Sequence, residues 1–388
     1  MAEGCEQLLN TFINIGNFLF MTQKLILDGS KILWHNDRLQ AWIRGERFAP
    51  ITIDMALSRN CNYKCEYCYG QLQENSRKKI TFEVMRNFFD DCAEMGVRGV
   101  SFVSDGESTM NPYLAEIITY GNKQGIALAL GSNGLLLNRN LLEKILPAIT
   151  YLRFNISAGE RNRYAQIHGV PPHYFDKVIE NIQTALAIKK QLGLTVTIGM
   201  QMVLLPQYKD QIIPLSLLAQ KLSPDYLVIK HCTDDEEGSL GIDYSKYQEL
   251  IPTLKEAETF STSQFTVSVK WSKIQAEGKR SYEQCYGVPF HLQISGSGLV
   301  APCGSFFHEK YKQYHIGNFV EQRFKDLVFS DRYWEIINTL ASPHFNAKSM
   351  CACLCLQHKT NEVLDRYKKG EIELSIPQGN PPMHLNFI

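Results

Sequence analysis

The sequence predicts a protein of the α/β class with a parallel sheet built from six strand-helix units. Short apolar runs alternate with amphipathic stretches between about Ile51 and Lys230, which is typical of βαβ units. The strands are expected at Ile51–Leu57, Gly99–Val103, Ile126–Leu130, Tyr151–Ile156, Thr195–Leu204 and Tyr226–Lys230. A chain of 388 residues, of which 44% are apolar, can bury a barrel plus an appended domain.

Two helices between these strands have clear boundary signals. One is expected at Phe175–Leu192, where apolar residues recur at helical spacing and a glycine follows as a stop. Another begins after Thr81, a good N-cap, and runs to Gly96. The acidic, glycine-bearing run Thr233–Gly241 then breaks the alternation, so we place a domain boundary there. A helix at Tyr244–Glu258 is expected to follow it.

Charge and apolar patterning argue against nucleic acid and membrane partners. Forty basic and forty acidic residues give a net charge of zero, so the chain as a whole lacks the field that attracts polyanions. The opening stretch around Leu8–Phe20 is interrupted by asparagine and glycine, and no basic region precedes it. It therefore matches neither a signal peptide nor a membrane span. The eleven cysteines are grouped and not spread as in a disulfide scaffold, which favours metal clusters in a reducing cytoplasm.

Three cysteines, Cys61, Cys65 and Cys68, lie in a C-x3-C-x2-C run. A [4Fe-4S] cluster normally takes four thiolates, so a local set of three leaves one iron open. A small molecule with two adjacent donors, such as the amino and carboxylate groups of S-adenosylmethionine, fits that corner. A zinc knuckle or a chance cluster of buried cysteines is the alternative, although zinc sites usually repeat a C-x2-C pair.

This run, with the aromatic Tyr67 before its last cysteine, resembles the cluster motif of the radical S-adenosylmethionine superfamily. The resemblance implies a partial (β/α)6 TIM-type barrel that binds S-adenosylmethionine and a [4Fe-4S] cluster held by three cysteines, with Tyr67 beside the cofactor. It also implies that the reduced cluster cleaves S-adenosylmethionine to a 5′-deoxyadenosyl radical, which abstracts hydrogen from a substrate. The electron would come from a reducing partner such as flavodoxin or ferredoxin.

Ligands of such a barrel bind where the βα loops converge. The loop after the second expected strand, Ser104-Asp105-Gly106-Glu107, resembles the G-G-E-P loop of the family, with Asp105 in place of a glycine and Ser108 in place of the proline. Gly106 would let the backbone approach the cofactor, and Glu107 would accept hydrogen bonds from its ammonium group. An ordinary acidic loop is the alternative.

Further cofactor contacts are implied by the same resemblance. Asn133 lies in an asparagine-glycine turn similar to one found near the cofactor, and Ser157 matches the serine at the end of the fourth strand. Where the family often has an arginine that binds the cofactor carboxylate, this chain has His168, so Arg161 or Arg163 are alternative candidates.

A lysine and a cysteine end the sixth expected strand. Alternation puts Lys230 and Cys232 on one face and His231 on the other. The thiol could hand a hydrogen atom to a substrate radical, and the ammonium could hold a substrate carboxylate or phosphate. The alternative is a buried cysteine that acts as a small apolar side chain.

The remaining cysteine group begins with Cys285, which precedes an expected hairpin at Leu292–Ile294 and Leu299–Ala301, and Cys303 follows the second strand. The spacing from Gly298 to the second of these cysteines resembles the G-x4-C element of SPASM and twitch domains, which carry auxiliary clusters. The resemblance implies a small α+β domain of this kind after the barrel.

The group ends in a run of three cysteines, Cys351, Cys353 and Cys355, where a twitch domain has C-x2-C. With Cys285 and Cys303 there are five thiols, one more than a fully ligated cluster needs. We predict one auxiliary [4Fe-4S] cluster, held by Cys285, Cys303 and two of the last three. A four-thiolate zinc site is the alternative.

These observations give the following division. Residues 1–50 form an N-terminal extension, 51–235 the barrel, 236–280 a connecting helix and linker, 281–360 the auxiliary-cluster domain, and 361–388 a C-terminal helix and extended tail. Whether the proline-bearing tail docks is left open.

The expected reaction is hydrogen abstraction from a small-molecule substrate, such as a sugar or sugar nucleotide, that ends in oxidation or epimerisation. A fully ligated auxiliary cluster would suit oxidation, because it could accept the surplus electron. Epimerisation would need a hydrogen donor such as Cys232. Modification of a ribosomally made peptide is the main alternative, disfavoured because only about fifty residues precede the barrel. RNA modification and a non-catalytic metal-binding role are further alternatives.

Overall fold

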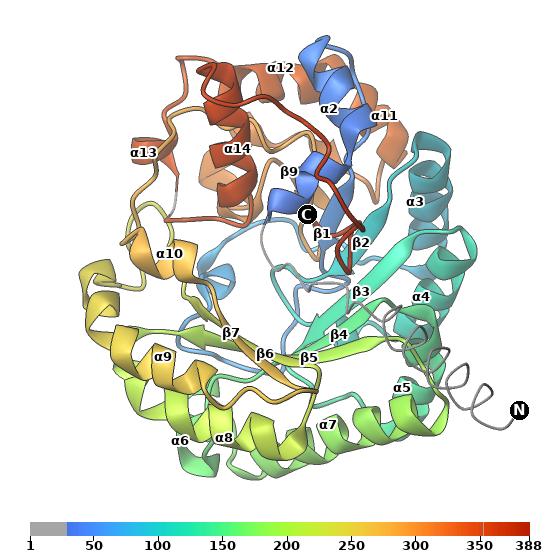
Figure 1. Cartoon of the computed structure of the whole chain (residues 1–388). Helices are drawn as coiled ribbons and strands as arrows, with labels where there is room; N and C mark the ends of the chain where they lie inside the picture. The colour runs from blue at the N-terminus through green and yellow to red at the C-terminus, as the bar shows by residue number, and fades with distance from the viewer. Residues whose placement is uncertain (1–28, 352) are drawn as a thin grey trace, which may run out of the picture.

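The computed structural model describes residues 29–351 and 353–388, and its ten strands in this part of the chain form one sheet. The strands are β1 (Thr52–Met55), β2 (Gly99–Phe102), β3 (Ala127–Ser132), β4 (Tyr151–Asn155), β5 (Thr197–Leu204), β6 (Tyr226–His231), β7 (Thr266–Val269), β8 (His291–Ile294), β9 (Leu299–Ala301) and β10 (Gly317–Asn318). Their spatial order is β10-β9-β8-β1-β2-β3-β4-β5-β6-β7. The sheet curves into an open barrel with helices around its outside (Figure 1). All six strands expected from the sequence are present.

The helices cover the outer face of this sheet (Figure 1). They are α2 (Asn36–Ile43), α3 (Phe82–Met95), α4 (Leu114–Lys123), α5 (Arg139–Ile145), α6 (Arg161–His168), α7 (His173–Gln191), α8 (Ile212–Leu222), α9 (Ile251–Glu258), α10 (Trp271–Gln275), α11 (Phe324–Phe329), α12 (Asp331–Leu340), α13 (Ala347–Met350) and α14 (His358–Lys368). As expected, the Thr81 side chain caps α3 by accepting a hydrogen bond from Val84 N, and Gly96 ends it in the left-handed conformation.

The parallel sheet is wider than the six strands that the sequence predicts. β7 lies in the stretch expected to be a linker and pairs with β6 in parallel. At the other edge, β8 pairs in parallel with β1, while β9 and β10 add antiparallel strands. The C-terminal hairpin therefore continues the barrel sheet, and the helix expected at Tyr244–Glu258 starts as a 3-10 helix (Tyr244–Leu250) before α9.

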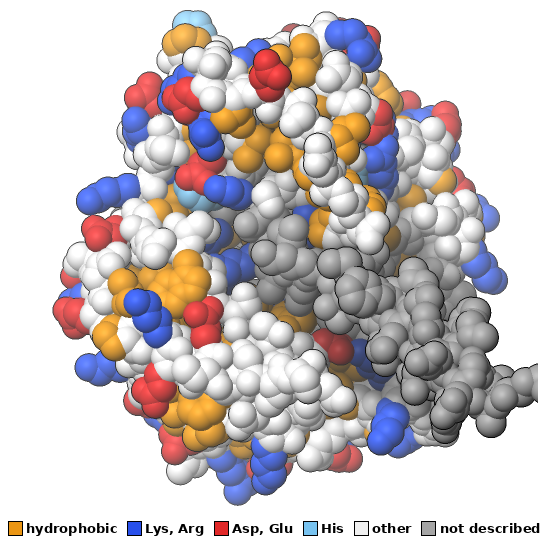
Figure 2. All heavy atoms as spheres, viewed as in Figure 1, with side chains coloured by type: hydrophobic (Ala, Val, Ile, Leu, Met, Phe, Trp, Pro, Cys, Tyr) orange, Lys and Arg blue, Asp and Glu red, His pale blue; other side chains and the backbone are white. Residues whose placement is uncertain are grey.

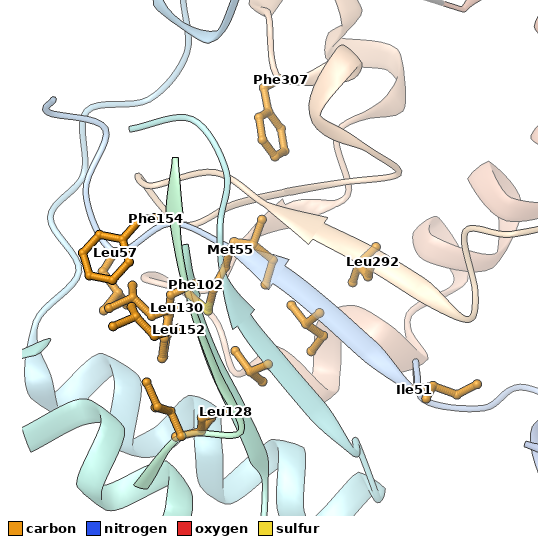
Figure 3. Packing of buried hydrophobic residues seen from close by; sticks show 14 of the residues in the cluster. Ile51, Met55, Leu57, Phe102, Leu128, Leu130, Leu152, Phe154, Leu292 and Phe307 are labelled. Carbon is orange, nitrogen blue, oxygen red and sulfur yellow. The ribbon is translucent and has the colours of Figure 1, made fainter. Parts of the chain in front are cut away.

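The apolar core lies between the sheet and the helices. Alternate residues along the strands point outward, and this set is fully buried: Ile53, Met55, Val100, Phe102, Leu128, Leu130, Leu152, Phe154, Ile198 and Met200. Figure 3 shows several of them packed against one another over neighbouring strands. Because these side chains face the helices, the alternate positions face the barrel interior.

The interior positions are mostly polar, in contrast to the packed apolar layers of a closed TIM barrel. They include Asp54 on β1, Arg153 on β4, Gln201 on β5 and Lys230 on β6, all of which line one cavity. The barrel therefore encloses a polar cavity and not a second core.

The C-terminal tail docks, which settles the question that the sequence left open. The Lys31 ammonium donates to His384 O (3.0 Å), and the Thr52 hydroxyl donates to Asn386 O (2.7 Å). The His384 ring stacks on Tyr151 with 5.2 Å between ring centroids. The tail thus crosses the amino-terminal ends of the strands, and its end lies at the centre of the barrel in Figure 1.

No helix within residues 29–351 and 353–388 is both long and apolar enough to cross a membrane. The opening stretch Leu8–Phe20, which we expect to be neither signal peptide nor membrane span, lies outside the described residues.

Candidate active site

One cavity of about 720 Å³ lies inside the barrel, and its wall includes residues of the strands, of the loops that follow them and of the C-terminal tail. Its wall includes all three thiols of the C-x3-C-x2-C run, and also Cys232, Cys303 and Cys355. Residues from the barrel and from the C-terminal region therefore border the same space.

The loop that carries Cys61, Cys65 and Cys68 follows β1 and is pinned to the end of α6. The backbone N–H of Lys64 donates to His168 O (3.1 Å), and that of Glu66 donates to Ile167 O (3.0 Å). These bonds hold the loop over the cavity.

Burial and the proximity of the other thiols make Cys61 and Cys65 hard to ionise on their own. Burial raises the pKa of Cys61 to about 11, and the neighbouring Cys68 adds to the rise. Burial also raises the pKa of Cys65, with Cys68 and Cys61 contributing further. The three thiolates would repel one another unless cations lay between them, and the iron ions of a cluster supply that charge. The donor set therefore fits a cluster ligated by three cysteines.

His168 lies at this loop and lines the cavity, and both of its ring nitrogens have partners in the protein. Its Nε2 accepts a hydrogen bond from Ser157 N (3.1 Å), and burial lowers its pKa to about 3, so the ring is neutral. In a neutral ring the hydrogen is then on Nδ1, which lies 3.2 Å from Cys65 Sγ and 3.4 Å from Tyr67 Oη. Both nitrogens are engaged, and the geometry gives no support to the expected grip on the carboxylate.

Arg161 and Arg163, the alternative candidates for binding the cofactor carboxylate, also have partners in the protein. Arg163 forms an ion pair with Asp210, its Nε donating over 2.7 Å, and is not part of the cavity wall. Arg161 pairs with Asp176 (3.1 Å). These pairs belong to the outer surface around α6.

Glu107 is buried and lines the cavity, as expected for a cofactor contact. Its Oε1 accepts from the Thr109 hydroxyl (2.7 Å) and the Ser132 hydroxyl (2.9 Å), and its Oε2 accepts from Asn133 N (2.8 Å). A carboxylate oxygen accepts two hydrogen bonds, so Oε2 retains capacity for one further donor. The carboxylate is fixed in place and can accept from a ligand ammonium.

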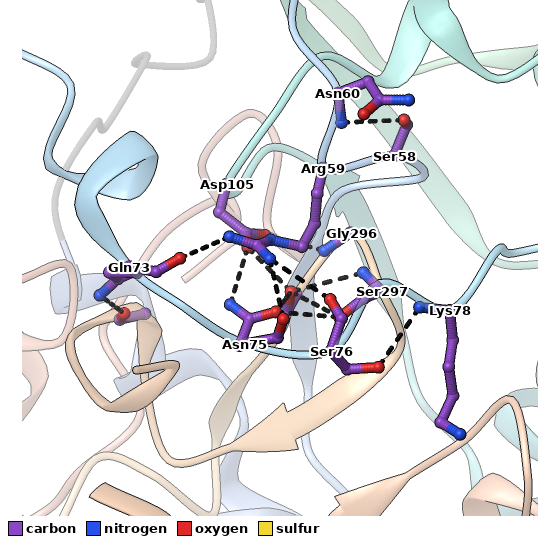
Figure 4. Close-up of polar contacts among 12 residues, drawn as sticks. Ser58, Arg59, Asn60, Gln73, Asn75, Ser76, Lys78, Asp105, Gly296 and Ser297 are labelled. Atoms are coloured by element: carbon purple, nitrogen blue, oxygen red, sulfur yellow. Dashed lines mark hydrogen bonds and ion pairs between the residues drawn. The ribbon is translucent and has the colours of Figure 1, made fainter. Parts of the chain in front are cut away.

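Asp105 lines the cavity and also joins two distant parts of the chain. Its Oδ1 accepts from Gly296 N (2.8 Å), and its Oδ2 accepts from the Ser295 hydroxyl (2.8 Å) and from Arg59 Nε (3.2 Å). Figure 4 shows this cluster, with Asn75 beside it. The carboxylate joins the barrel loop to the turn between β8 and β9.

Gly106 follows with φ +135°, and a Cβ there would lie 2.0 Å from Ser58 O. Only glycine fits this close approach of two backbones. The loop is therefore tight although it lacks the second glycine of the G-G-E-P pattern.

The other cofactor contacts expected from the sequence are placed as follows. Ser104, Asn133 and Tyr67 line the cavity. Asn133 Nδ2 donates to Asn62 Oδ1 (2.7 Å), which ties the β3 loop to the cysteine loop. Ser157 is buried and its hydroxyl accepts from Val203 N (3.2 Å), so it is not part of the cavity wall.

Lys230 and Cys232 both line the cavity, as strand alternation predicts. His231 points to the other side and packs edge-on to Tyr244. Burial raises the pKa of the Cys232 thiol to about 12, and Lys230 opposes that rise only in part. The thiol is therefore protonated, which is the form that can donate a hydrogen atom.

A second group of thiols surrounds a small enclosed cavity in the C-terminal region. Cys285, Cys303, Cys351 and Cys355 all line it, and Cys303 and Cys355 border the large cavity too. Burial raises the pKa of Cys285 to about 12, with Cys355 and Cys303 adding to the rise. Four thiols around one space fit a fully ligated cluster.

Cys353 is directed elsewhere. It does not line the small cavity, and its thiol has a hydrogen bond with the Tyr244 side chain. In the run of three cysteines, Cys351 and Cys355 therefore line the small cavity with the other thiols, whereas Cys353 does not. No three His, Cys, Asp or Glu side chains in the described parts of the chain are close enough to hold a single metal ion.

Sequence reasoning missed Arg153, whose guanidinium lies in the cavity wall. The signal was present, because the strand Tyr151-Leu152-Arg153-Phe154-Asn155 alternates apolar and polar residues. The same alternation that placed Lys230 would have placed Arg153 inside the barrel.

Comparison with family models agrees with this geometry. Residues 55–214 match the model of the radical SAM superfamily, and residues 285–355 match that of an iron-sulfur cluster-binding domain, SPASM. The chain belongs to the radical SAM superfamily and carries a C-terminal SPASM domain. Its cofactors are S-adenosylmethionine and [4Fe-4S] clusters.

Individual relatives are distant. The chain is 20% identical to the tungsten-containing aldehyde ferredoxin oxidoreductase cofactor-modifying protein of Pyrococcus furiosus, over 72% of this chain and 81% of that protein. It is 27% identical to the AdoMet-dependent heme synthase of Methanosarcina barkeri, but that match covers only 35% of this chain and 39% of the relative.

Solved structures share the fold. SuiB of Streptococcus suis bound to S-adenosylmethionine superposes with a TM-score of 0.60 at 17% identity, over 86% of this chain and 80% of SuiB. Native anSMEcpe with bound AdoMet gives a TM-score of 0.56 at 16% identity, over 75% of this chain and 84% of that chain.

Proposed function

We propose that this enzyme cleaves S-adenosylmethionine at a cluster held by Cys61, Cys65 and Cys68 and abstracts hydrogen from a small-molecule substrate bound in the barrel. The single observation that carries the proposal is the shared cavity, whose wall includes these thiols, Cys232, and the auxiliary thiols Cys303 and Cys355. When bound, the cluster supplies the electron that breaks the sulfonium bond and so generates the radical.

The residues of the chain bind and orient the cofactor and shield the cavity from water. Glu107, fixed by donors from the β2 and β3 loops, is suited to accept a hydrogen bond from the cofactor ammonium. The docked tail covers the amino-terminal end of the barrel through the His384 and Asn386 contacts and limits the access of water from that side.

Two outcomes for the substrate radical remain candidates, oxidation and epimerisation. Oxidation is supported by Cys303 and Cys355, because an auxiliary cluster at these residues would border the substrate cavity and could accept an electron. Epimerisation is supported by the protonated Cys232 thiol in the same wall. Replacing Cys232 by alanine should abolish product but not cofactor cleavage if its thiol is the hydrogen donor, whereas unchanged product formation would remove that role.

Modification of a peptide is the second candidate function. It is favoured by the structural likeness to SuiB, which has also been solved with its precursor peptide SuiA. We prefer a small molecule because the cavity lies inside the barrel. A reducing partner such as flavodoxin or ferredoxin and a cytoplasmic location belong to the same proposal.

Anaerobic reconstitution tests the proposal. The wild-type protein should bind about eight irons per chain and, with dithionite, release 5′-deoxyadenosine from S-adenosylmethionine. The Cys65→Ala variant should bind about four irons per chain and should release no 5′-deoxyadenosine. Cys92→Ala is the matched control, because Cys92 is buried in α3 and lines neither cavity. If the wild-type protein binds the irons but never releases 5′-deoxyadenosine, the proposed function is wrong.

A further inference from the structure

The charge of the cavity wall differs from that of the whole chain. Eight lysines and arginines line the cavity but only three aspartates and glutamates do, although the chain has forty of each charge. The basic residues are Lys31, Arg59, Lys64, Arg153, Lys230, Lys270, Lys273 and Lys359. Figure 2 shows basic side chains gathered beside the central hollow. The wall therefore attracts anions that the chain as a whole would not.

The three acidic residues already have partners. Asp54 pairs with the His291 ring (3.1 Å). Asp105 is held by Arg59 and the β8-β9 turn, and Glu107 accepts from the β3 loop. None of these carboxylates forms an ion pair with Arg153 or Lys230, so the wall itself does not neutralise those two cations.

Several of the basic residues also have partners. Arg59 pairs with Asp105, and Lys359 pairs with Glu362 (3.2 Å). The Lys273 ammonium donates hydrogen bonds to Leu354 O and Cys355 O, so it is already engaged by the segment that carries the last three cysteines. The side chains of Arg153 and Lys230 differ, because neither donates a hydrogen bond to, or forms an ion pair with, any residue in the described parts of the chain.

The Arg153 side chain lies in a socket formed by two glycines. In the sheet register, Arg153 stands between Gly131 on β3 and Gly199 on β5. A Cβ at Gly131 would lie 3.1 Å from Arg153 Nη2, and one at Gly199 would lie 2.1 Å from the Tyr226 ring. Side chains at either position would crowd the guanidinium or the ring beside it. The sheet thus leaves room for a guanidinium whose Nε is buried without a partner.

Lys230 belongs to the same pocket. Arg153 lies close enough to lower the pKa of Lys230, although burial is the larger cause. Asp54 acts on Lys230 in the opposite sense, but it forms no ion pair with either cation, and two buried cations cost free energy unless an anion joins them. Such an arrangement is unfavourable in the empty cavity and favourable once an oxyanion is bound.

We propose that Arg153 and Lys230 form the binding site for an oxyanion group of the substrate, either a phosphate or a carboxylate. The inference rests on the proposed function and narrows its substrate to an anionic small molecule. A guanidinium presents paired donors that match both groups, and an ammonium adds a point charge. The site lies on strands β4 and β6 and not on the loop that carries Cys61, Cys65 and Cys68, so the anion would anchor the substrate while another part of it faces the cofactor.

The test measures anion binding to the fully reconstituted protein by anaerobic calorimetry. Inorganic pyrophosphate is the probe for phosphate, succinate is the probe for carboxylate, and erythritol is the neutral comparison. Arg153→Gln and Lys230→Gln should each weaken the binding of the preferred anion at least tenfold. Arg153→Lys should restore part of the loss, and Lys190→Gln, on the exposed face of α7, should change nothing.

The outcomes separate this site from the proposed function. Failure of both anions to bind, equal weakening by Lys190→Gln, or loss of S-adenosylmethionine affinity in place of anion affinity overturns the oxyanion site. The same wild-type preparation is assayed for 5′-deoxyadenosine without added anion. If it forms 5′-deoxyadenosine but binds no anion, only the oxyanion site is overturned. Anion binding that depends on Arg153 and Lys230, without any 5′-deoxyadenosine, supports the site and overturns the proposed function.

Discussion

The two cysteine groups of this molecule differ in what surrounds them. The barrel group has three thiols on one loop, at the mouth of a large cavity. The C-terminal group has four thiols from separate segments around a small enclosed cavity, with a fifth thiol directed away. Three ligands leave an iron open for a cofactor, whereas four leave none. This difference is our reason for proposing that the barrel group carries out the chemistry and that the C-terminal group transfers electrons.

The largest expected effect is a loss of iron on substitution in the run of three cysteines, which would test the difference between the two cysteine groups. Cys355→Ala removes a thiol that lines both cavities, so it should reduce the iron content from about eight to about four per chain. Cys353→Ala, its neighbour and matched control, should retain about eight. Iron analysis measures the iron content of the two variants, and electron paramagnetic resonance of the reduced proteins measures their clusters. Equal iron loss in the two variants would contradict the assignment of Cys355, and not Cys353, as a ligand of the auxiliary cluster.

The contact between the two regions is the next target. Asp105→Ala removes the carboxylate that holds Arg59 and the β8-β9 turn. Loss of one partner from a buried ion pair costs about 3 to 5 kcal/mol, and we expect about 3 because Arg59 keeps backbone acceptors such as Gln73 O. The free energy of unfolding from anaerobic urea titration measures this.

Glu83→Ala is the control for this prediction. Glu83 pairs with Arg86 on the exposed face of α3, and loss of a surface pair should cost less than about 1 kcal/mol. A similar effect for the two variants would show that Asp105 is not an important link between the barrel and the C-terminal region.

The sequence predicts local features of this molecule better than contacts between distant segments. The six barrel strands follow from apolar runs, and the α3 boundaries follow from Thr81 and Gly96, because each depends on neighbouring residues. The cysteine run is equally local. Asp105 was predicted as a cofactor contact because its loop resembles a family motif, but two of its partners, Ser295 and Gly296, lie almost two hundred residues further along the chain.

Other features could not be predicted because they need the folded sheet. β7 is only four residues long and lies within a polar stretch, so it gains its stability from pairing with β6. Docking of the tail depends on acceptors such as Asn386 O that meet Thr52 only when the strands are in place. The separation of Cys353 from its neighbours likewise depends on the position of Tyr244.

The oxyanion site makes a pH-dependent prediction for the barrel. Burial lowers the pKa of Lys230 to about 7, helped by Arg153 and Lys273 and opposed by Cys232 and Asp54. The lysine is charged below that pKa and neutral above it, so succinate should bind about tenfold more weakly at pH 8 than at pH 6. Calorimetry at the two values measures this.

Raising the pH from 6 to 8 can only increase the negative charge of succinate, so weaker binding at pH 8 would report on the protein. Lys230→Arg keeps its charge at both values and should remove most of the dependence. If the arginine variant shows the same pH dependence as the wild type, a different group is responsible.

The smallest expected effect concerns the hydrogen bond from His168 to the barrel cysteines. Because Nε2 accepts from Ser157 N, the Nδ1 hydrogen points towards Cys65 Sγ, 3.2 Å away. A donor to a cluster sulfur stabilises the more negative, reduced state and raises the reduction potential. His168→Leu should lower the potential by about 40 mV, the equivalent of one hydrogen bond of about 1 kcal/mol in a one-electron couple. His168→Gln, which keeps an N–H and an acceptor, should restore part of it. A redox titration followed by electron paramagnetic resonance measures the shift, and a potential unchanged in His168→Leu would leave His168 with only a packing role beside the cysteine loop.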